Sequence, residues 1–247
     1  MSEISKRWDK KERNIKNVSS EIQSLRNSIT RDLSSNDEKE FLTALVIAIM
    51  DETAERVGNE SSAENGRIGV TGLMKKNVTI SGNQVTLKYT GKSGVNHTKT
   101  FSDSKIANSL KKAINNSPSE YVFTTSDGFK IKADRVNRYL NEFDISAKDI
   151  RGYSANKWII DRLKNIDAEE TETKRKTQFN KVVSSVSEKI GHGRATLKNH
   201  YMFSSIEENF VENGKVSSID NLKNKEEYKQ GGLVKTFTYE IGGLWNY

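Results

Sequence analysis

The chain contains a single proline, Pro118, in 247 residues. Proline breaks helices most strongly, because it lacks the N–H donor and clashes with the preceding turn. Long helices can therefore run through most of this sequence, which contains no internal repeat or low-complexity tract. The length permits one sizeable core, or a main domain with small appendages.

One stretch departs from this helical patterning. Three short segments share a strand-like composition: NVTI at 77–80, QVTLKYT at 84–90 and NHTKTF at 96–101. Glycine-containing turns at 81–83 and 91–94 separate them. They predict a small antiparallel sheet within about residues 70–102, with Lys92 at the tip of its second hairpin. The expected fold is mainly α with a small three-stranded antiparallel sheet (α+β).

A strong helix is predicted from Asn36, which can cap it ahead of the acidic Asp37 and Glu38. Five apolar residues then follow helical spacing: Leu42, Leu45, Val46, Ile49 and Val57. Gly58 is a plausible end of this helix.

Further helix boundaries follow from local capping signals. Asp103 or Ser104 can cap one helix, and Ser146 with Asp149 forms a capping box for another. Gly191 ends a later helix.

A final helix from about Arg194 presents Tyr201. Trp158 and Phe179 are interpreted as core residues. The charged run 168–176 is interpreted as a solvated face or a linker.

These patterns divide the chain into three parts. We expect a charged helical segment at 1–35, a catalytic domain at 36–215, and an extension of unknown role at 216–247. Within the extension, residues 233–241 could form a strand.

Composition narrows the function classes. Lys and Arg outnumber Asp and Glu by 40 to 33, and the net charge of +7 favours a polyanionic partner, usually nucleic acid. The chain has no cysteine, and its three histidines are scattered along the sequence. Both facts argue against a metal site. No apolar run approaches the roughly 20 residues that span a bilayer, and the polar N-terminus lacks a secretory signal. We therefore expect a soluble, intracellular protein without membrane contact.

Several residues match the chemistry of breaking and rejoining a DNA phosphodiester. A tyrosine can attack phosphorus, remain attached, and later leave. Arginines can clamp the charged transition state, a lysine can protonate the departing 5′ oxygen, and a histidine can donate to the phosphate. The chain offers these types in order: Arg56, Lys92, Arg151, His192 and Tyr201. Taken singly, each has an ordinary structural explanation, and only the ordered set favours catalysis.

The motifs around these residues resemble the catalytic core of type IB DNA topoisomerases of the poxvirus and bacterial type. The RVGNE turn, the TGL segment, the GKSG hairpin, SAKDIRGYSAN and VSEKIGHGRATLKNHYMFSSIEENFVENGKV occur in matching order over roughly residues 10–215. The resemblance implies the DNA breaking-rejoining catalytic-core fold. It also implies relaxation of supercoiled DNA through a 3′-phosphotyrosyl intermediate, strand swivelling and religation, without metal or ATP.

The resemblance implies a role for each residue. Arg56 and Arg151 clamp the scissile phosphate, Lys92 is the general acid, His192 binds a non-bridging oxygen, and Tyr201 is the nucleophile. Lys148 lies three residues before Arg151 and contacts DNA near the phosphate. Many bacterial members have asparagine where this chain has His192, which matches the poxvirus and recombinase branches.

Two alternatives remain open. A tyrosine recombinase or integrase shares the fold, but usually places His-x-x-Arg before the second arginine, where this chain has Lys148-Asp149-Ile150-Arg151. A non-catalytic DNA-binding relative is disfavoured by the intact set of five residues.

The partner expected from the resemblance is double-stranded DNA. The chain begins about where the family's N-terminal lobe would end, so we expect either a piece of a longer protein or a natural short form. A separate lobe or a second chain would complete the clamp, and DNA binding without it would be weak and salt-sensitive. We expect a monomer on DNA, in the cytoplasm, nucleoid or a virus-infected cell.

Overall fold

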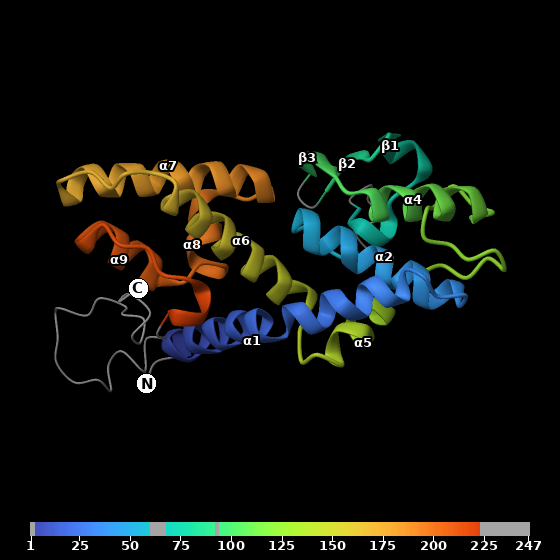
Figure 1. Cartoon of the computed structure of the whole chain (residues 1–247), viewed down its shortest axis with the longest axis horizontal. Helices are drawn as coiled ribbons and strands as arrows, with labels where there is room; N and C mark the ends of the chain where they lie inside the picture. The colour runs from blue at the N-terminus through green and yellow to red at the C-terminus, as the bar shows by residue number, and fades with distance from the viewer. Residues whose placement is uncertain (1–2, 60–67, 92–93, 223–247) are drawn as a thin grey trace. The chain divides into compact units, whose positions relative to one another are not determined.

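The computed structural model describes residues 3–59, 68–91 and 94–222. It divides into two compact units (Figure 1). One comprises Glu21–Arg151, and the other comprises Met1–Ser20 with Gly152–Tyr247. The unit boundaries fall within helices α1 (Glu3–Asp32) and α6 (Ala147–Lys164).

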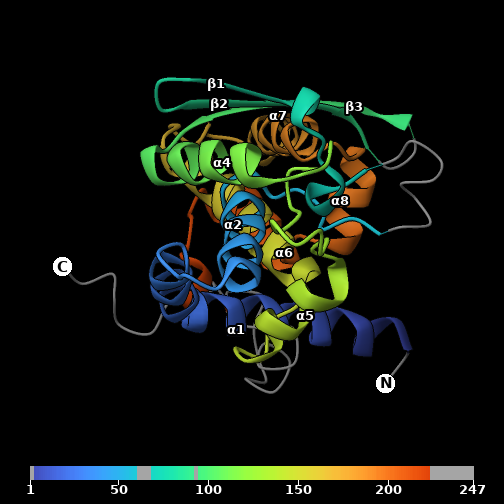
Figure 2. The same ribbon diagram turned by 90° about the vertical axis from the view of Figure 1, so that its right-hand side faces the viewer.

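The Glu21–Arg151 unit contains the small sheet that the sequence predicts. Its antiparallel strands lie in the order β1 (Val78–Ser81), β2 (Gln84–Thr90) and β3 (Asn96–Ser102). Figures 1 and 2 show the sheet stacked on α4 (Ser104–Asn116), with α2 (Glu38–Thr53) beneath. The expected fold class, mainly α with a three-stranded antiparallel sheet, is confirmed.

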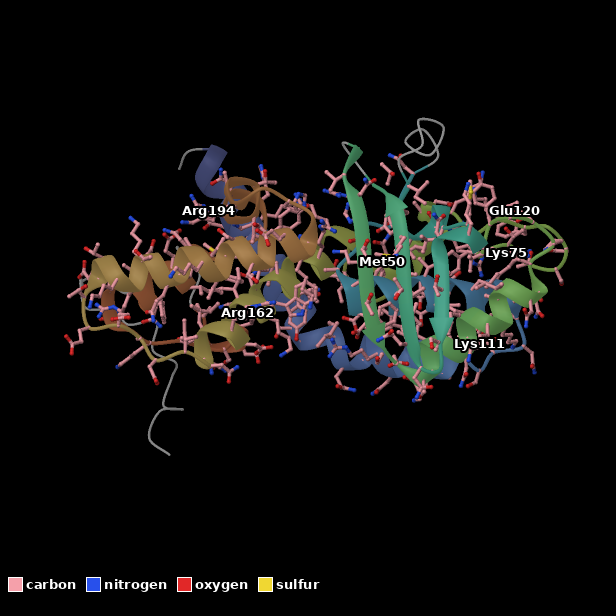
Figure 3. The ribbon with its side chains drawn as sticks, turned by 90° about the horizontal axis from the view of Figure 1, so that it is seen from above. Met50, Lys75, Lys111, Glu120, Arg162 and Arg194 are labelled. Carbon is pink, nitrogen blue, oxygen red and sulfur yellow. The ribbon has the colours of Figure 1, made fainter. Side chains whose placement is uncertain are left out.

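The core beneath this sheet follows from strand alternation. Val85, Leu87 and Tyr89 are buried and alternate along β2 with exposed or half-buried residues. In the view from above, Met50 of α2 lies under the strands (Figure 3), and its side chain is buried.

Helix α2 differs from the sequence prediction at both ends. Asp37, not Asn36, is the N-cap, because its carboxylate accepts from the backbone N–H of Lys39 and Glu40. The helix ends at Thr53 rather than at Gly58, because Ala54 adopts the left-handed conformation with φ 53°. Val57 therefore lies outside it.

The other elements of this unit were predicted more closely. Asp103 caps α4 through a bond from the backbone N–H of Ile106. Helix α5 (Ala133–Asn141) buries Val136 and Leu140. The short 3-10 helices η1 (Val70–Gly72) and η2 (Lys75–Asn77) precede the sheet.

Hydrogen bonds connect segments of this unit that are distant in the sequence. Tyr121 forms an antiparallel bridge with Met74, and next to it the Lys75 N–H donates to the Glu120 carbonyl at 2.8 Å (Figure 3). Arg26 of α1 donates two hydrogen bonds to Asp51 of α2, at 2.7 and 3.1 Å.

In the second unit, α7 (Glu172–Ile190) packs against α8 (Arg194–His200) and α9 (Ser204–Asn213) (Figure 1). The rings of Phe179 and Phe210 lie 6.3 Å apart in this core. A last 3-10 turn, η4, covers Ile219–Asn221.

Helix capping follows local sequence in this half of the chain. Helix α6 begins at the expected capping box: the Asp149 N–H donates to the Ser146 hydroxyl, and the Ser146 N–H donates to the Asp149 carboxylate. Gly191 ends α7 with φ 74°, as predicted.

Two interpretations need correction. Trp158 is half-buried rather than a core residue, with the Lys189 ammonium 3.6 Å from the centre of its ring. The run 168–176 is only partly a loop, because Thr171 caps α7 and the helix starts at Glu172.

The predicted strand at 233–241 lies outside the described residues. The division at residues 35 and 215 stays a prediction. No helix in the described part of the chain is both long and apolar enough to cross a membrane.

Candidate active site

Arg56 lies on a backbone segment that is held on one side by η1. The Arg56 carbonyl accepts from the Val70 N–H at 2.9 Å, and the Val57 carbonyl accepts from the Thr71 N–H at 2.9 Å. Gly69 permits this approach, since a Cβ there would lie 2.5 Å from the Gly58 nitrogen. The half-buried Arg56 side chain therefore extends from a fixed segment.

Arg151 reaches the same segment from α6. Its side chain is buried, and its Nη1 donates to the carbonyl of Ala54. Both residues belong to the Glu21–Arg151 unit, so the structure brings the two predicted clamp arginines to one stretch of backbone. A buried guanidinium stays charged, and its fork can bond to a phosphate.

A buried polar network adjoins this segment, and sequence reasoning missed it. The Glu55 carboxylate lies 2.9 Å from both His97 Nδ1 and Lys99 Nζ. His97 is buried and stacks on Tyr89, with ring centroids 5.2 Å apart. The signal in the sequence is that two polar residues of β3, His97 and Lys99, occupy positions that face inward.

The charges of this network shift two pKa values. Burial by itself raises the pKa of Glu55, but the hydrogen bond with His97 and the charge of Lys99 outweigh burial and lower it to about 2. Burial raises the pKa of the Tyr89 phenol, the negative charge of Glu55 adds to this, and the charge of Arg151 opposes it. Glu55 is therefore an anion, and His97 Nδ1 must be the donor in their bond.

The second unit places His192 and Tyr201 side by side. His192 follows the left-handed Gly191, and its N–H donates to the Ser187 carbonyl at 2.9 Å. Tyr201 occupies the C-cap of the short helix α8. Their rings stack with centroids 5.0 Å apart and planes inclined by 30°. Both residues are half-buried.

Asn156 of α6 holds the backbone around Tyr201, and sequence reasoning also missed this residue. Its Nδ2 donates to the Tyr201 carbonyl at 2.6 Å and to the Gly152 carbonyl at 2.7 Å. Its Oδ1 accepts from the Phe203 N–H at 2.8 Å. Asn156 is completely buried, and it holds the backbone that directly follows the side chain that would attack phosphorus. No local sequence signal marks it.

The remaining predicted residues are less constrained by the structure. Lys148 is exposed in the first turn of α6. Lys92 lies outside the described residues. Among the residues that the structure describes, no cluster of three or more His, Asp or Glu side chains could hold a metal ion.

Comparison with solved structures identifies the class of fold. A XerH site-specific recombinase, solved as a post-cleavage complex with a palindromic difH substrate, matches with a TM-score of 0.54 and 16% identity. The match covers 79% of this chain and 52% of that chain. The chain thus has the fold of tyrosine recombinase catalytic domains.

Sequence comparison then identifies the family. The family described as "Eukaryotic DNA topoisomerase I, catalytic core" matches residues 4–226, and the chain belongs to it. A DNA topoisomerase 1B of Acanthamoeba polyphaga mimivirus is 26% identical over 205 residues, covering 74% of this chain and 61% of the relative. A DNA topoisomerase 1B of vaccinia virus (strain Copenhagen) is 26% identical over 146 residues, covering 58% of this chain and 45% of the relative. The chain therefore spans about half to three fifths of the length of these relatives.

Proposed function

We propose that this chain is a type IB DNA topoisomerase that relaxes supercoiled DNA by cutting and rejoining one strand. The stacked pair His192 and Tyr201, anchored by Asn156, is the observation that carries the proposal. It supplies a fixed tyrosine beside a phosphate-binding histidine, in a chain that belongs to the topoisomerase I catalytic-core family.

The proposed reaction begins with the phenol oxygen of Tyr201. The phenol releases its proton to solvent as this oxygen attacks the scissile phosphorus, and the bond from phosphorus to the 5′ oxygen breaks. Lys92 supplies the proton that the departing oxygen needs, and Lys148 contacts the DNA nearby. The products are a 3′-phosphotyrosyl protein and a free 5′ hydroxyl.

Arg56, Arg151 and His192 stabilise the transition state in this proposal. Negative charge builds on the non-bridging oxygens as phosphorus becomes pentavalent, and fixed cations stabilise that charge most when they need no reorganisation. The bond from Arg151 to the Ala54 carbonyl, and the bonds from η1 to the carbonyls of Arg56 and Val57, support such a fixed arrangement.

Rejoining reverses these steps. After the broken strand swivels, the 5′ hydroxyl attacks phosphorus, the phosphotyrosyl bond breaks, and the phenol regains its proton. The bond energy is conserved in the phosphotyrosyl link, and DNA torsion drives relaxation. The reaction therefore requires neither a nucleotide nor a metal ion.

Incubation with supercoiled plasmid, without ATP and with EDTA, tests the proposal. We expect wild-type protein to relax the plasmid and a denaturing quench to trap protein on 3′ ends, whereas Tyr201→Phe does neither. Relaxation by Tyr201→Phe would contradict the proposal. DNA binding without any covalent adduct would instead identify a non-catalytic relative, and strand exchange between two duplexes would identify a recombinase.

A further inference from the structure

The Glu55 side chain is a buried charge placed directly before Arg56. Only 2% of the side chain is exposed, and its carboxylate contacts His97 and Lys99, both on β3. An apolar side chain of similar size often stabilises a protein as well as a buried ion pair does, because two charges lose their hydration on burial. The location of this ion pair therefore favours a role beyond stability.

Segment 54–57 is held from two other directions. Arg151 donates to the Ala54 carbonyl, and the backbone of η1 donates to the carbonyls of Arg56 and Val57. The Thr71 hydroxyl adds a bond to the Val57 carbonyl at 2.8 Å. Glu55 supplies the third attachment, to the sheet, and the three together fix the backbone from which Arg56 extends.

The His97 ring also determines the geometry where β2 ends. A Cβ at Gly91 would lie 2.7 Å from His97 Nε2, so this position accommodates only glycine without a shift of the ring. Stacking on Tyr89 fixes the plane of the ring, which directs Nδ1 at Glu55.

We propose that Glu55, held by His97 and Lys99, is a positioning residue that keeps Arg56 and Arg151 arranged for transition-state binding. This inference rests on the proposed topoisomerase function for its catalytic consequence. Its structural consequence, an ordered 54–57 segment, is independent of that function.

The test compares Glu55→Gln with Asp51→Asn as a matched control. Asp51, in α2, is likewise a carboxylate in an ion pair, but its partner Arg26 belongs to α1 rather than to segment 54–57 or the sheet. The cleavage readout is the single-turnover rate of adduct formation on a duplex with a nicked leaving strand. DNA affinity is measured separately by equilibrium titration of the same duplex.

We expect Glu55→Gln to slow cleavage about 30- to 100-fold, as small misplacement of catalytic groups does, with DNA affinity within about threefold of wild type. Asp51→Asn should cleave within about threefold of wild type. Equal cleavage by both variants, or a loss of DNA affinity with an unchanged cleavage rate, would overturn the proposal.

A second pair of variants covers the case in which Glu55→Gln does not fold. His97→Asn keeps a donor near the Nδ1 position, whereas His97→Leu removes it. We expect His97→Asn to cleave at least tenfold faster than His97→Leu. Equal rates would overturn the proposal.

Hydrogen exchange separates this inference from the proposed function. Peptides covering 54–58 should lose protection in Glu55→Gln and keep it in Asp51→Asn, and the Arg151 Nε–H signal should shift only in Glu55→Gln. If wild-type protein forms no adduct, the proposed function fails, and exchange alone decides the positioning role. Unchanged protection in Glu55→Gln would then overturn it.

Discussion

Replacing Asn156 with leucine should lower the free energy of unfolding by removing the bonds that hold the backbone after Tyr201, the proposed nucleophile. Leucine has a similar volume, so the change removes three hydrogen bonds and leaves little cavity. The Phe203 N–H is buried, and losing its partner costs about 1–3 kcal/mol, with a smaller cost at the partly buried Tyr201 carbonyl. We expect a total loss of about 3 kcal/mol, which corresponds to about 6–12 °C in Tm for a chain of this size.

The effect on catalysis should be larger than stability alone predicts. Without Asn156, the Tyr201 carbonyl and the Phe203 N–H lose these hydrogen bonds to α6, so we expect the phenol oxygen to sample positions away from its line of attack. A displacement of about 1 Å can slow a reaction about 100-fold. We therefore expect adduct formation by Asn156→Leu to slow about 100-fold at a temperature where the variant is fully folded.

Asn165→Ala is the matched control for this variant. Asn165 also donates to a carbonyl four residues earlier, that of Asp161 at 2.6 Å, but it is exposed. It should change Tm by less than about 2 °C and leave cleavage unchanged. The measurements are calorimetric melting and single-turnover cleavage with a denaturing quench. If Asn156→Leu cleaves as fast as wild type despite a lower Tm, the position of Tyr201 does not depend on Asn156.

Two further predictions concern the unit that carries the arginines. The pKa of Glu55 is lowered from 4.5 to about 2, so its contribution to stability is present above about pH 4.5 and is lost as pH falls toward 2. Denaturant titration should show that Glu55→Gln removes about 3 kcal/mol of this acid-dependent stability; parallel curves for both proteins between pH 5 and pH 2 would contradict this. Gly69→Ala should lower the free energy of unfolding by about 2 kcal/mol or more, because the new Cβ would lie 2.5 Å from the backbone nitrogen of Gly58. Neither backbone segment can move apart without breaking the hydrogen bonds to η1. Gly193→Ala, which meets no atom within 4 Å, is the control, and equal melting temperatures for the two alanine variants would refute the argument.

Local signals in the sequence predicted most of the secondary structure. Capping by Asp103, the box formed by Ser146 and Asp149, and the left-handed Gly191 act within one or two helical turns, so neighbouring residues are enough to identify them. The three strands follow from alternation in the same way.

The end of α2 could not be predicted from local signals. Its residues from Phe41 to Met50 are all buried, so hydrophobic spacing does not mark where the helix stops. The chain turns at Ala54, a residue with no particular preference for positive φ, and the carbonyl there accepts a bond from Arg151, which is 97 positions away. The helix thus ends where a distant side chain binds the backbone, and not at Gly58, where the local sequence predicted its end.

Some residues of the candidate site could likewise be predicted from the sequence, and others could not. The order and spacing of Arg56, Lys92, Arg151, His192 and Tyr201 predict these residues from the sequence, because the proposed chemistry requires those residue types. Glu55 with His97, and Asn156, became evident only in the folded chain. Their proposed roles depend on burial and on distant partners, 42 positions away for Glu55 with His97 and 45 for Asn156 with Tyr201. The sequence alone does not show whether a polar side chain is buried or solvated.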